Sequence, residues 1–247
     1  MPVLNISVNL VIDIGNTQIK LALFSDRKLV TKQVYTSAEI PSVIKSLFTK
    51  YDIRDTILSS VTKTNLELLK LLESKNGVVC FDEYTKIPIE NLYQTPKTLG
   101  KDRLANAIGA SQLFKNEHVL CIDIGTCIKF DIITKLGHYL GGSISPGVNM
   151  RFQSLNVFTA KLPLIERKDN PDLIGTTTNS SIQSGIQWGI EKEIDGTITE
   201  YHRQYPQLKV VLTGGDHIHF AKALKNSIFA RPNLTLEGLN EVLIFNE

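Results

Sequence analysis

Short apolar segments alternate with amphipathic segments along the first half of the chain. Apolar runs bounded by turn residues predict strands, and apolar residues at helical spacing predict helices. The predicted elements, in chain order, are strands at Leu10–Ile14, Lys20–Ser25 and Lys28–Thr36, a helix over Ala38–Lys50, a strand at Asp55–Ser60, a helix around Asn65–Ser74 and a strand at Val78–Phe81. This order is typical of a mixed sheet with helices on its faces.

The second half repeats the pattern. A helix over Gly100–Lys115 leads into three strands at Val119–Ile124, Lys129–Thr134 and Tyr139–Ile144. A long helix over Ser180–Tyr201 and a strand at Lys209–Thr213 follow, and the tail at Val242–Phe245 predicts a closing strand or the edge of a helix. Because no low-complexity linker interrupts the chain, we expect two closely packed halves, residues 1–115 and 116–247.

One short motif occurs twice. Val11–Thr17 reads VIDIGNT, and Cys121–Thr126 reads CIDIGT. In each copy an apolar strand ends in Asp, and a Gly two residues later lets the backbone turn so that its N–H groups approach an anion. A hydroxyl or amide side chain follows and adds a hydrogen bond. The repeat therefore predicts a duplicated nucleotide-binding fold with two phosphate loops facing a cleft.

Composition and charge narrow the class of protein. The chain has 247 residues, 42% of them hydrophobic and 21% charged, with a net charge of +2, as in ordinary globular proteins. A near-neutral chain does not favour nucleic acid as a partner. The sequence contains no signal peptide and no run long enough to span a membrane, so no membrane partner is expected. Three cysteines without CxxC spacing indicate reduced thiols and a cytoplasmic location.

Four further segments combine turn residues with polar groups. Each has a structural explanation, as a helix cap or tight turn, and a functional one, as a backbone or hydroxyl surface for a ligand. They are Thr98–Arg103, with Asp102 at the start of a helix, the glycine-rich Gly141–Gly147, the hydroxyl cluster Thr176–Asn179, and Thr213–Asp216 after a strand. Taken singly, none of them distinguishes the two explanations.

Their order along the chain is more specific. The chain reads DxGNT, LGxDRxAN, DxGT, GGxIxPG, GTTT followed by IxSG, and TGG, and between Leu10 and about Ala223 it resembles the type III pantothenate kinases. That family belongs to the superfamily of acetate kinases, sugar kinases, heat-shock chaperones and actin. The resemblance implies duplicated ribonuclease H-like (actin-like ATPase) domains, each a mixed sheet flanked by helices, with the active-site cleft between them. It also implies a homodimer.

The resemblance assigns roles to individual residues. It implies that Asp102 is the general base and that Asp123 binds a monovalent cation, K⁺ or NH₄⁺. The residues implied to bind ATP are Asp13, Ile14, Gly15, Asn16, Thr17, Gln18, Ile19, Lys20 and Thr126. Those implied to bind pantothenate are Tyr93, Gly100, Lys101, Asp102, Arg103 and Thr178. ATP is expected with a divalent cation, Mg²⁺.

The second phosphate loop departs from the family pattern. The family usually has DxGTATT, whereas this chain has Asp123-Ile-Gly-Thr126-Cys-Ile-Lys129, so two hydroxyls are lost and a cation is gained. If Lys129 points into the cleft, its ammonium replaces part of the monovalent cation's charge. If Lys129 follows strand alternation outward, it is a surface residue. The sequence leaves both alternatives open.

The residues assigned here supply the groups that phosphoryl transfer requires. These groups are a base for the acceptor hydroxyl and cations or N–H groups around the phosphate. We therefore predict ATP-dependent phosphorylation of pantothenate to 4'-phosphopantothenate, the first step of coenzyme A biosynthesis. The alternatives are a kinase of the same superfamily acting on another small hydroxyl substrate and a non-catalytic nucleotide-binding regulator. A metal pair at His217 and His219 is disfavoured, because no further ligands stand at suitable spacing.

The long helix predicted over Ser180–Tyr201 carries an apolar stripe. Its members are Ile182, Ile186, Trp188 and Ile190. A stripe of this width can exceed what one core buries, so we expect it to form part of the dimer interface.

Overall fold

The computed structural model describes residues 4–15, 18–60, 66–75 and 77–247. The chain forms two compact units. Unit 1 comprises Met1–Gln112 together with Asn233–Glu247, and unit 2 comprises Leu113–Pro232. The predicted boundary after residue 115 lies close to the first crossing between units. The segment Asn233–Glu247, predicted as part of the second half, packs in unit 1.

Unit 1 is built on a five-stranded mixed sheet in the order β3-β2-β1-β4-β5. β1 pairs antiparallel with β2 and parallel with β4, so the duplicated motif lies at the end of the central strand. The strands are β1 (Leu4–Ile14), β2 (Ile19–Ser25), β3 (Lys28–Tyr35), β4 (Tyr51–Ser60) and β5 (Val78–Cys80), with the short β6 (Glu90–Asn91) later in the chain. The helices are α1 (Ile40–Lys50), α2 (Leu66–Glu73), the 3-10 turn η1 (Pro96–Thr98), α3 (Lys101–Leu113) and α7 (Leu234–Phe245).

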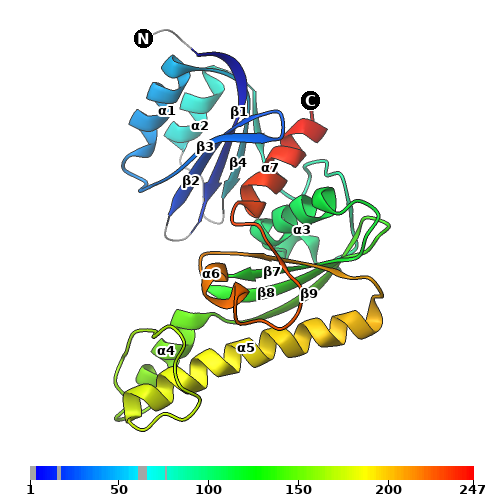
Figure 1. Cartoon of the computed structure of the whole chain (residues 1–247). Helices are drawn as coiled ribbons and strands as arrows, with labels where there is room; N and C mark the ends of the chain where they lie inside the picture. Colours follow the sequence, from blue (N-terminus) through cyan, green and yellow to red (C-terminus); the bar gives the residue numbers. More distant parts are fainter. Residues whose placement is uncertain (1–3, 16–17, 61–65, 76) are drawn as a thin grey trace. The chain divides into compact units, whose positions relative to one another are not determined.

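The two faces of this sheet are covered by different helices. Leu10 and Ile12 of β1 belong to a buried cluster with Ile40 and Ile44 of α1. Asn9, on the opposite face of β1, donates a hydrogen bond to Asn240 of α7 at 3.2 Å. Figure 1 shows α1 and α2 together on one side of the sheet and α7 on the other. The C-terminal helix therefore completes the unit that the N-terminal strand begins.

Charge and close packing both hold α7 in place. Arg27, in the turn between β2 and β3, makes two hydrogen bonds to Glu241 of α7, at 2.7 and 3.0 Å. These bonds and the glutamate charge raise the pKa of Arg27 above its ordinary value. Where α3 and α7 cross, an added Cβ on Gly238 would lie 1.8 Å from the carbonyl oxygen of Ala105. Only glycine allows the two backbones to approach this closely.

Five strands of a second mixed sheet belong to unit 2, and they lie in the order β11-β10-β7-β8-β9. β7 pairs antiparallel with β8 and parallel with β10. The strands are β7 (Val119–Ile124), β8 (Cys127–Ile133), β9 (His138–Pro146), β10 (Lys209–Thr213) and β11 (Phe229–Ala230). The helices are α4 (Val148–Val157), α5 (Thr178–Gln204) and α6 (His217–Ala221). The predicted α/β class, with two mixed sheets flanked by helices, is confirmed.

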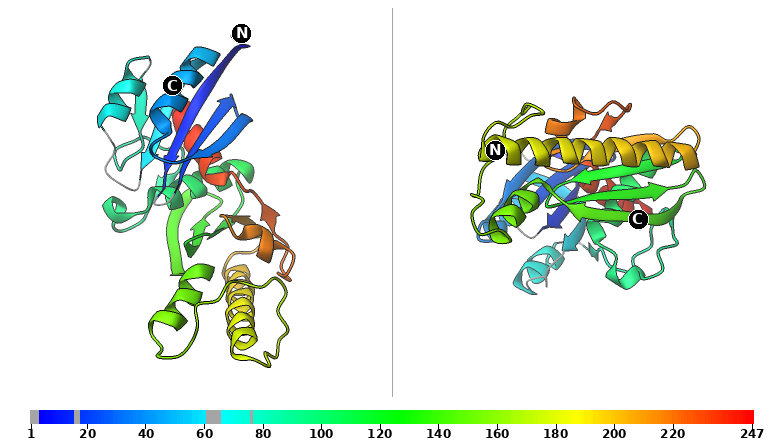
Figure 2. Two further views of the ribbon diagram at one scale, coloured as in Figure 1. Left: turned by 90° about the vertical axis from the view of Figure 1, so that its left-hand side faces the viewer. Right: turned by 90° about the horizontal axis from the view of Figure 1, so that it is seen from below.

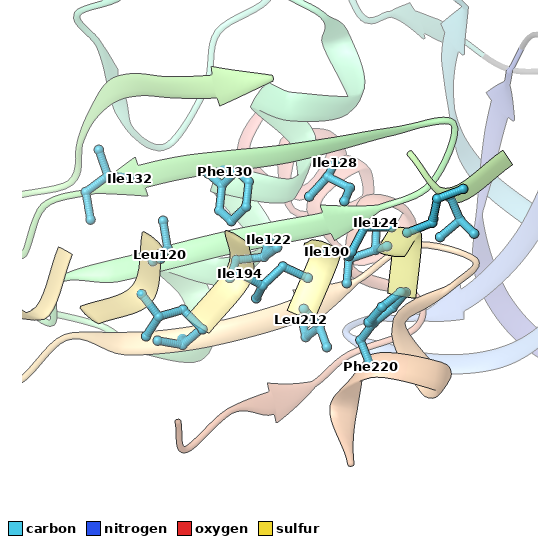
Figure 3. Close-up of a cluster of buried hydrophobic side chains, with 14 of the residues drawn as sticks. Leu120, Ile122, Ile124, Ile128, Phe130, Ile132, Ile190, Ile194, Leu212 and Phe220 are labelled. Atoms are coloured by element: carbon cyan, nitrogen blue, oxygen red, sulfur yellow. The ribbon is translucent and has the colours of Figure 1, made fainter. Parts of the chain in front are cut away.

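The long helix α5 covers one face of the second sheet. Its isoleucines at positions 182, 186, 190, 194 and 198 are buried in one cluster with alternate residues of β7 and β8. Figure 3 shows Ile122 and Phe130 from the sheet beside Ile190 and Ile194 from the helix. Figure 2 shows α5 running along the sheet. The isoleucines of this helix and the sheet residues beneath them therefore form much of the core of unit 2.

This burial changes one expectation. Ile182, Ile186 and Ile190 were predicted to form part of a subunit interface, but they are at most 7% exposed within unit 2 and are not available to a partner. Trp188 is half-buried, and its indole N–H donates to the carbonyl oxygen of Pro171 at 3.3 Å. The three isoleucines of the stripe are instead buried against the second sheet.

Several elements were absent from the sequence prediction. Helices α4 and α6 follow the glycine-rich turns, and no element was predicted at either position. The tail at Val242–Phe245, left open between a strand and a helix edge, lies in helix α7. Within the described residues, no helix has both the length and the apolar character that a membrane crossing needs.

Gly238 and Gly196 provide a stability test. Gly238→Ala forces a Cβ into the backbone of α3, and we expect it to lower the free energy of unfolding by at least about 2 kcal/mol. Gly196 of α5 is exposed and has open space around its Cα, so Gly196→Ala is the control. It should raise the unfolding free energy by about 0.5–1 kcal/mol through helix propensity. Urea unfolding of both variants measures the difference, and equal effects would contradict the close crossing.

Candidate functional site

The first copy of the duplicated motif forms the turn between β1 and β2. Asp13 is 8% exposed at the end of β1 and lies opposite Lys20 of β2 in the antiparallel ladder. The N–H of Gly15 donates to the carbonyl oxygen of Gln18 at 3.0 Å, which closes the turn. The predicted ATP-binding residues Asn16 and Thr17 lie outside the described residues.

Two predicted ATP-binding residues in this turn face the core. Ile19 is buried in the cluster of unit 1, and Ile14 packs against that cluster. Their side chains are therefore occupied by packing, and only their backbone groups remain to contact a ligand. Gln18 is exposed and Lys20 is half-buried, so their polar side chains reach the surface beside Asp13.

The predicted pantothenate-binding residues of unit 1 lie together at the start of α3. Arg103 is 5% exposed, and its guanidinium lies 5.5 Å from the centre of the Tyr93 ring, a cation–π contact. Asp102 is half-buried in the first turn, and one of its oxygens accepts from the N–H of Arg103 at 2.9 Å.

Gly100, just before α3, leaves room for the Asp102 carboxylate. An added Cβ on Gly100 would lie 2.7 Å from Asp102 Oδ1. The carbonyl oxygen of Gly100 accepts from the N–H groups of Arg103 and Leu104, so Gly100 begins the helix without a capping side chain. Because Gly100 has no side chain, the Asp102 carboxylate can occupy this position. Lys101, which lies between the two residues in the sequence, is half-buried.

The second copy repeats the first in unit 2. Asp123 is the second-to-last residue of β7. It lies opposite Lys129 of β8, as Asp13 lies opposite Lys20 of β2. The N–H of Gly125 donates to the carbonyl oxygen of Cys127 at 3.1 Å, and Thr126 is exposed at the tip. Each unit thus ends its central strand in the same Asp, turn and Lys arrangement.

Two glycines from other loops pack against this second turn. An added Cβ on Gly147 would lie 2.2 Å from the carbonyl oxygen of Gly125, and one on Gly214 would lie 2.4 Å from Asp123 Oδ1. Gly214 also has φ of +92°, which side chains rarely adopt. The segments Gly141–Gly147 and Thr213–Asp216 are therefore brought to the second phosphate loop by backbone packing.

Lys129 contacts the carboxylate assigned to the monovalent cation. Its Nζ lies 2.8 Å from Asp123 Oδ2. The two side chains are 17% and 13% exposed, so the ion pair is largely shielded from water. Of the two alternatives that the sequence left open, the simple surface position is wrong.

A pocket in unit 2 lies at the N-terminus of α5. It has a volume of about 760 Å³, and its lining includes Thr178, Ser181 and Arg151. Thr177 caps the helix by accepting from the N–H of Ser180 at 3.2 Å, and it lines the pocket together with Thr178. A helix N-terminus and a nearby guanidinium both favour an anion.

Arg151 is the lining residue that sequence reasoning missed. Its Nε donates to the carbonyl oxygen of Pro146 at 2.8 Å, and its guanidinium is paired with Glu193 of α5. The missed signal was the helical spacing of Val148, Phe152 and Leu155 after the glycine-rich turn, which marks α4 and places Arg151 on its first turn.

The remaining candidate side chains have structural partners. His217 is buried with its Nδ1 2.5 Å from the carbonyl oxygen of Gly214, and His219 contacts Arg167 and Asp169. The described residues contain no cluster of metal-ligating side chains. Burial raises the pKa of the Cys121 thiol well above its ordinary value, and the charges of Asp131 and Asp123 add to the shift, which makes the thiol unreactive.

Comparison with known proteins supplies independent information. Residues 9–200 match the model of the type III pantothenate kinase family. A type III pantothenate kinase of Christiangramia forsetii is 46% identical over 241 residues, covering 97% of this chain and 99% of the relative.

Solved structures resemble the chain at lower identity. A Campylobacter jejuni protein assigned to the Baf family of transcriptional activators is 21% identical, with a TM-score of 0.63 over 96% of this chain and 98% of that chain. A Listeria monocytogenes protein assigned as an N-acetylmannosamine kinase is 13% identical, with a TM-score of 0.54 over 97% and 99%. These two similarities support the fold alone.

The glycine pair after β10 tests the packing of the second loop. Gly214→Ala introduces a left-handed alanine and a clash with Asp123, so we expect it to lower the free energy of unfolding by about 1–3 kcal/mol. Gly215→Ala is the matched control, because a Cβ there meets open space. Thermal unfolding compares the two, and a Gly214→Ala protein as stable as the control would contradict the packing described here.

Proposed function

The chain belongs to the type III pantothenate kinase family, phosphotransferases of coenzyme A biosynthesis, and we propose that its Asp102 is the general base of the reaction. In this proposal Asp102 takes the proton from the primary hydroxyl of pantothenate while that oxygen attacks the γ-phosphorus of ATP. The products are 4'-phosphopantothenate and ADP. The observation that carries the proposal is the placement of the Asp102 carboxylate at the start of α3.

The surroundings of Asp102 suit a base. Its carboxylate is half-buried, and the guanidinium of Arg103 is on the adjacent residue. The missing side chain at Gly100 leaves space around Asp102 Oδ1. We propose that Tyr93, Gly100, Lys101 and Arg103 bind pantothenate around this carboxylate, with Arg103 held in place by the Tyr93 ring.

ATP is assigned to the two hairpin turns. Each turn combines a backbone glycine with a polar tip, which suits phosphate oxygens. We propose that Asp13 lies near the triphosphate and its Mg²⁺, that Lys20 and the residues from Ile14 to Ile19 complete the first loop, and that Thr126 contacts ATP from the second. Mg²⁺ would neutralise phosphate charge as the γ-phosphoryl group is transferred. Because Ile14 and Ile19 are packed in the core, their contribution is limited to the backbone.

Thr178 is assigned to pantothenate through the pocket of unit 2. The pocket combines the N-terminus of the 27-residue helix α5 with Thr178 and Arg151. Pantothenate carries a carboxylate, and helix N-termini and arginines stabilise such groups. This supports Thr178 as a pantothenate-binding residue, and we propose Arg151, whose guanidinium is also paired with Glu193, as a second one.

The monovalent cation fits the described residues poorly. The resemblance places K⁺ or NH₄⁺ at Asp123, yet Asp123 Oδ2 lies 2.8 Å from the Lys129 ammonium. A second cation at that oxygen would be repelled by the first. We therefore assign no step of the reaction to a bound monovalent cation.

The homodimer is proposed through a different surface from the α5 stripe. Phe158 is 84% exposed, and other large apolar side chains in the segment from α4 to α5 are exposed as well. They are Val157, Leu164, Leu173 and Ile174. Exposed apolar groups of this size are typical of an interaction surface. This surface lies in the same segment as the pocket lined by Thr178.

Asp102→Asn tests the base. The variant keeps the size of the side chain and removes its basicity, so we expect kcat for pantothenate phosphorylation to fall by about 10²–10⁴-fold. Asp52→Asn, at an exposed carboxylate of β4, is the control and should retain wild-type activity. A coupled assay of ADP release, with product identified by mass spectrometry, measures both.

The alternatives predict other results. Phosphorylation of a sugar and not of pantothenate by the wild type would favour another kinase of the superfamily. ATP binding without turnover of any acceptor would favour a nucleotide-dependent regulator. An active Asp102→Asn protein would leave the family assignment intact and refute the general-base role.

The dimer surface is tested by charge. Phe158→Asp and Ile174→Asp place carboxylates on the exposed apolar segment and should convert the dimer to a monomer. Leu136→Asp, at an equally exposed leucine in the turn between β8 and β9, is the control and should leave the dimer intact. Light scattering after gel filtration gives the mass of each protein. Dimeric charge variants would place the interface elsewhere, and a monomeric wild type would refute the dimer.

A further inference from the structure

Lys129 owes its position to strand register. It lies directly opposite Asp123 in the antiparallel pairing of β7 and β8, so both side chains leave the sheet on the same face. The neighbours Ile128 and Phe130 point to the other face, into the core beneath α5 (Figure 3). The ion pair is therefore built into the sheet, unlike pairs between two flexible surface side chains.

We propose that the ammonium of Lys129 is a built-in monovalent cation at Asp123, so that phosphoryl transfer by this chain needs neither K⁺ nor NH₄⁺. The inference rests on the proposed function, because the reaction is the readout in which the cation matters. The ammonium carries the same single charge as K⁺ and contacts the same carboxylate that the resemblance assigns to the ion. Lys129 is a positioning residue that acts through Asp123.

Both oxygens of Asp123 are constrained. Oδ2 accepts from the Lys129 ammonium at 2.8 Å. Oδ1 lies on the side of Gly214, where an added Cβ would approach it to 2.4 Å. A carboxylate held in this way cannot swing to accommodate an added ion without breaking the pair.

The charge balance at the second turn follows from this pair. Asp123 stands two residues before Gly125, whose turn is assigned to phosphate. An unneutralised carboxylate there would repel the phosphate, since like charges at short range disfavour each other. The ammonium cancels that charge permanently, whereas a bound ion does so only when its concentration is sufficient.

The position of Lys129 in the motif supports the replacement of the bound monovalent cation by the lysine ammonium. The family pattern DxGTATT has a hydroxyl residue where this chain has Lys129. In unit 1 the equivalent place in the ladder, opposite Asp13, is also held by a lysine, Lys20. Both hairpins therefore place a lysine opposite the aspartate of the motif in the strand register.

The test compares the full-length wild type with Lys129→Ala, Lys129→Met and a control. Rates of pantothenate phosphorylation are measured in the chlorides of K⁺, NH₄⁺, Na⁺ and tetramethylammonium at constant ionic strength. The wild type should vary less than twofold among them. Lys129→Ala should lose at least tenfold in kcat in tetramethylammonium and recover most of it in K⁺ or NH₄⁺, because the deletion removes the charge and leaves space for an ion.

Two variants separate charge from packing. Lys129→Met removes the charge but fills the space, so its activity should fall without recovery in K⁺ or NH₄⁺. Lys209→Ala removes a lysine that pairs with Glu117 at 3.7 Å at the start of β10, and it should behave as the wild type. A wild type that requires K⁺, or a Lys129→Ala protein that is fully active in tetramethylammonium, would overturn the proposal.

A binding measurement separates this proposal from the proposed function. The rise in melting temperature on adding Mg²⁺ and a non-hydrolysable ATP analogue should be independent of K⁺ for the wild type. For Lys129→Ala it should be larger in K⁺ than in tetramethylammonium. If the wild type phosphorylates no pantothenate in any salt, the proposed function fails, and the melting data still decide the role of Lys129. A K⁺-dependent rise in the wild type would contradict that role.

Discussion

Close backbone packing around the Gly125 turn is the constraint on which the arrangement of unit 2 depends. Gly147 donates its N–H to the carbonyl oxygen of Thr126 at 3.1 Å, and Asp216 donates to that of Ile124 at 3.0 Å. These bonds pair two carbonyl groups of one turn with N–H groups from two segments that are distant in the sequence. Helix α4 begins directly after Gly147, and α6 begins directly after Asp216. One turn therefore sets where two helices start.

In unit 1 the C-terminal segment Asn233–Glu247 packs with the N-terminal part of the chain. The α7 helix packs on the sheet built around β1, and the crossing of α3 and α7 at Gly238 brings their backbones into contact. Because α3 carries Asp102 in its first turn, the apolar packing of the C-terminal helix positions the proposed base. The packing of this unit and its proposed chemistry therefore share the helix α3.

The two hairpins that carry the duplicated motif share one arrangement of residues. Both place an Asp opposite a Lys next to a glycine turn, and in both the neighbouring isoleucines pair across the strands. Four residues separate the paired Ile14 and Ile19, and three separate the paired Ile124 and Ile128. In the second hairpin the lysine forms an ion pair that stands where the family resemblance implies a free ion. Strand register alone decides that this lysine faces the carboxylate.

The sequence alone determined the longer strands, the helices α1, α2, α3 and α5, and the family, but not the two-residue strands β6 and β11. These features are local, because strand alternation, helical spacing and short glycine motifs are properties of neighbouring residues. It did not determine α4 or α6, the membership of Asn233–Glu247 in unit 1, or the burial of Ile182 and Ile186. Each of these depends on which distant surface covers a segment. Only the tertiary structure decided the direction of Lys129, because pairing between β7 and β8 places its ammonium against Asp123.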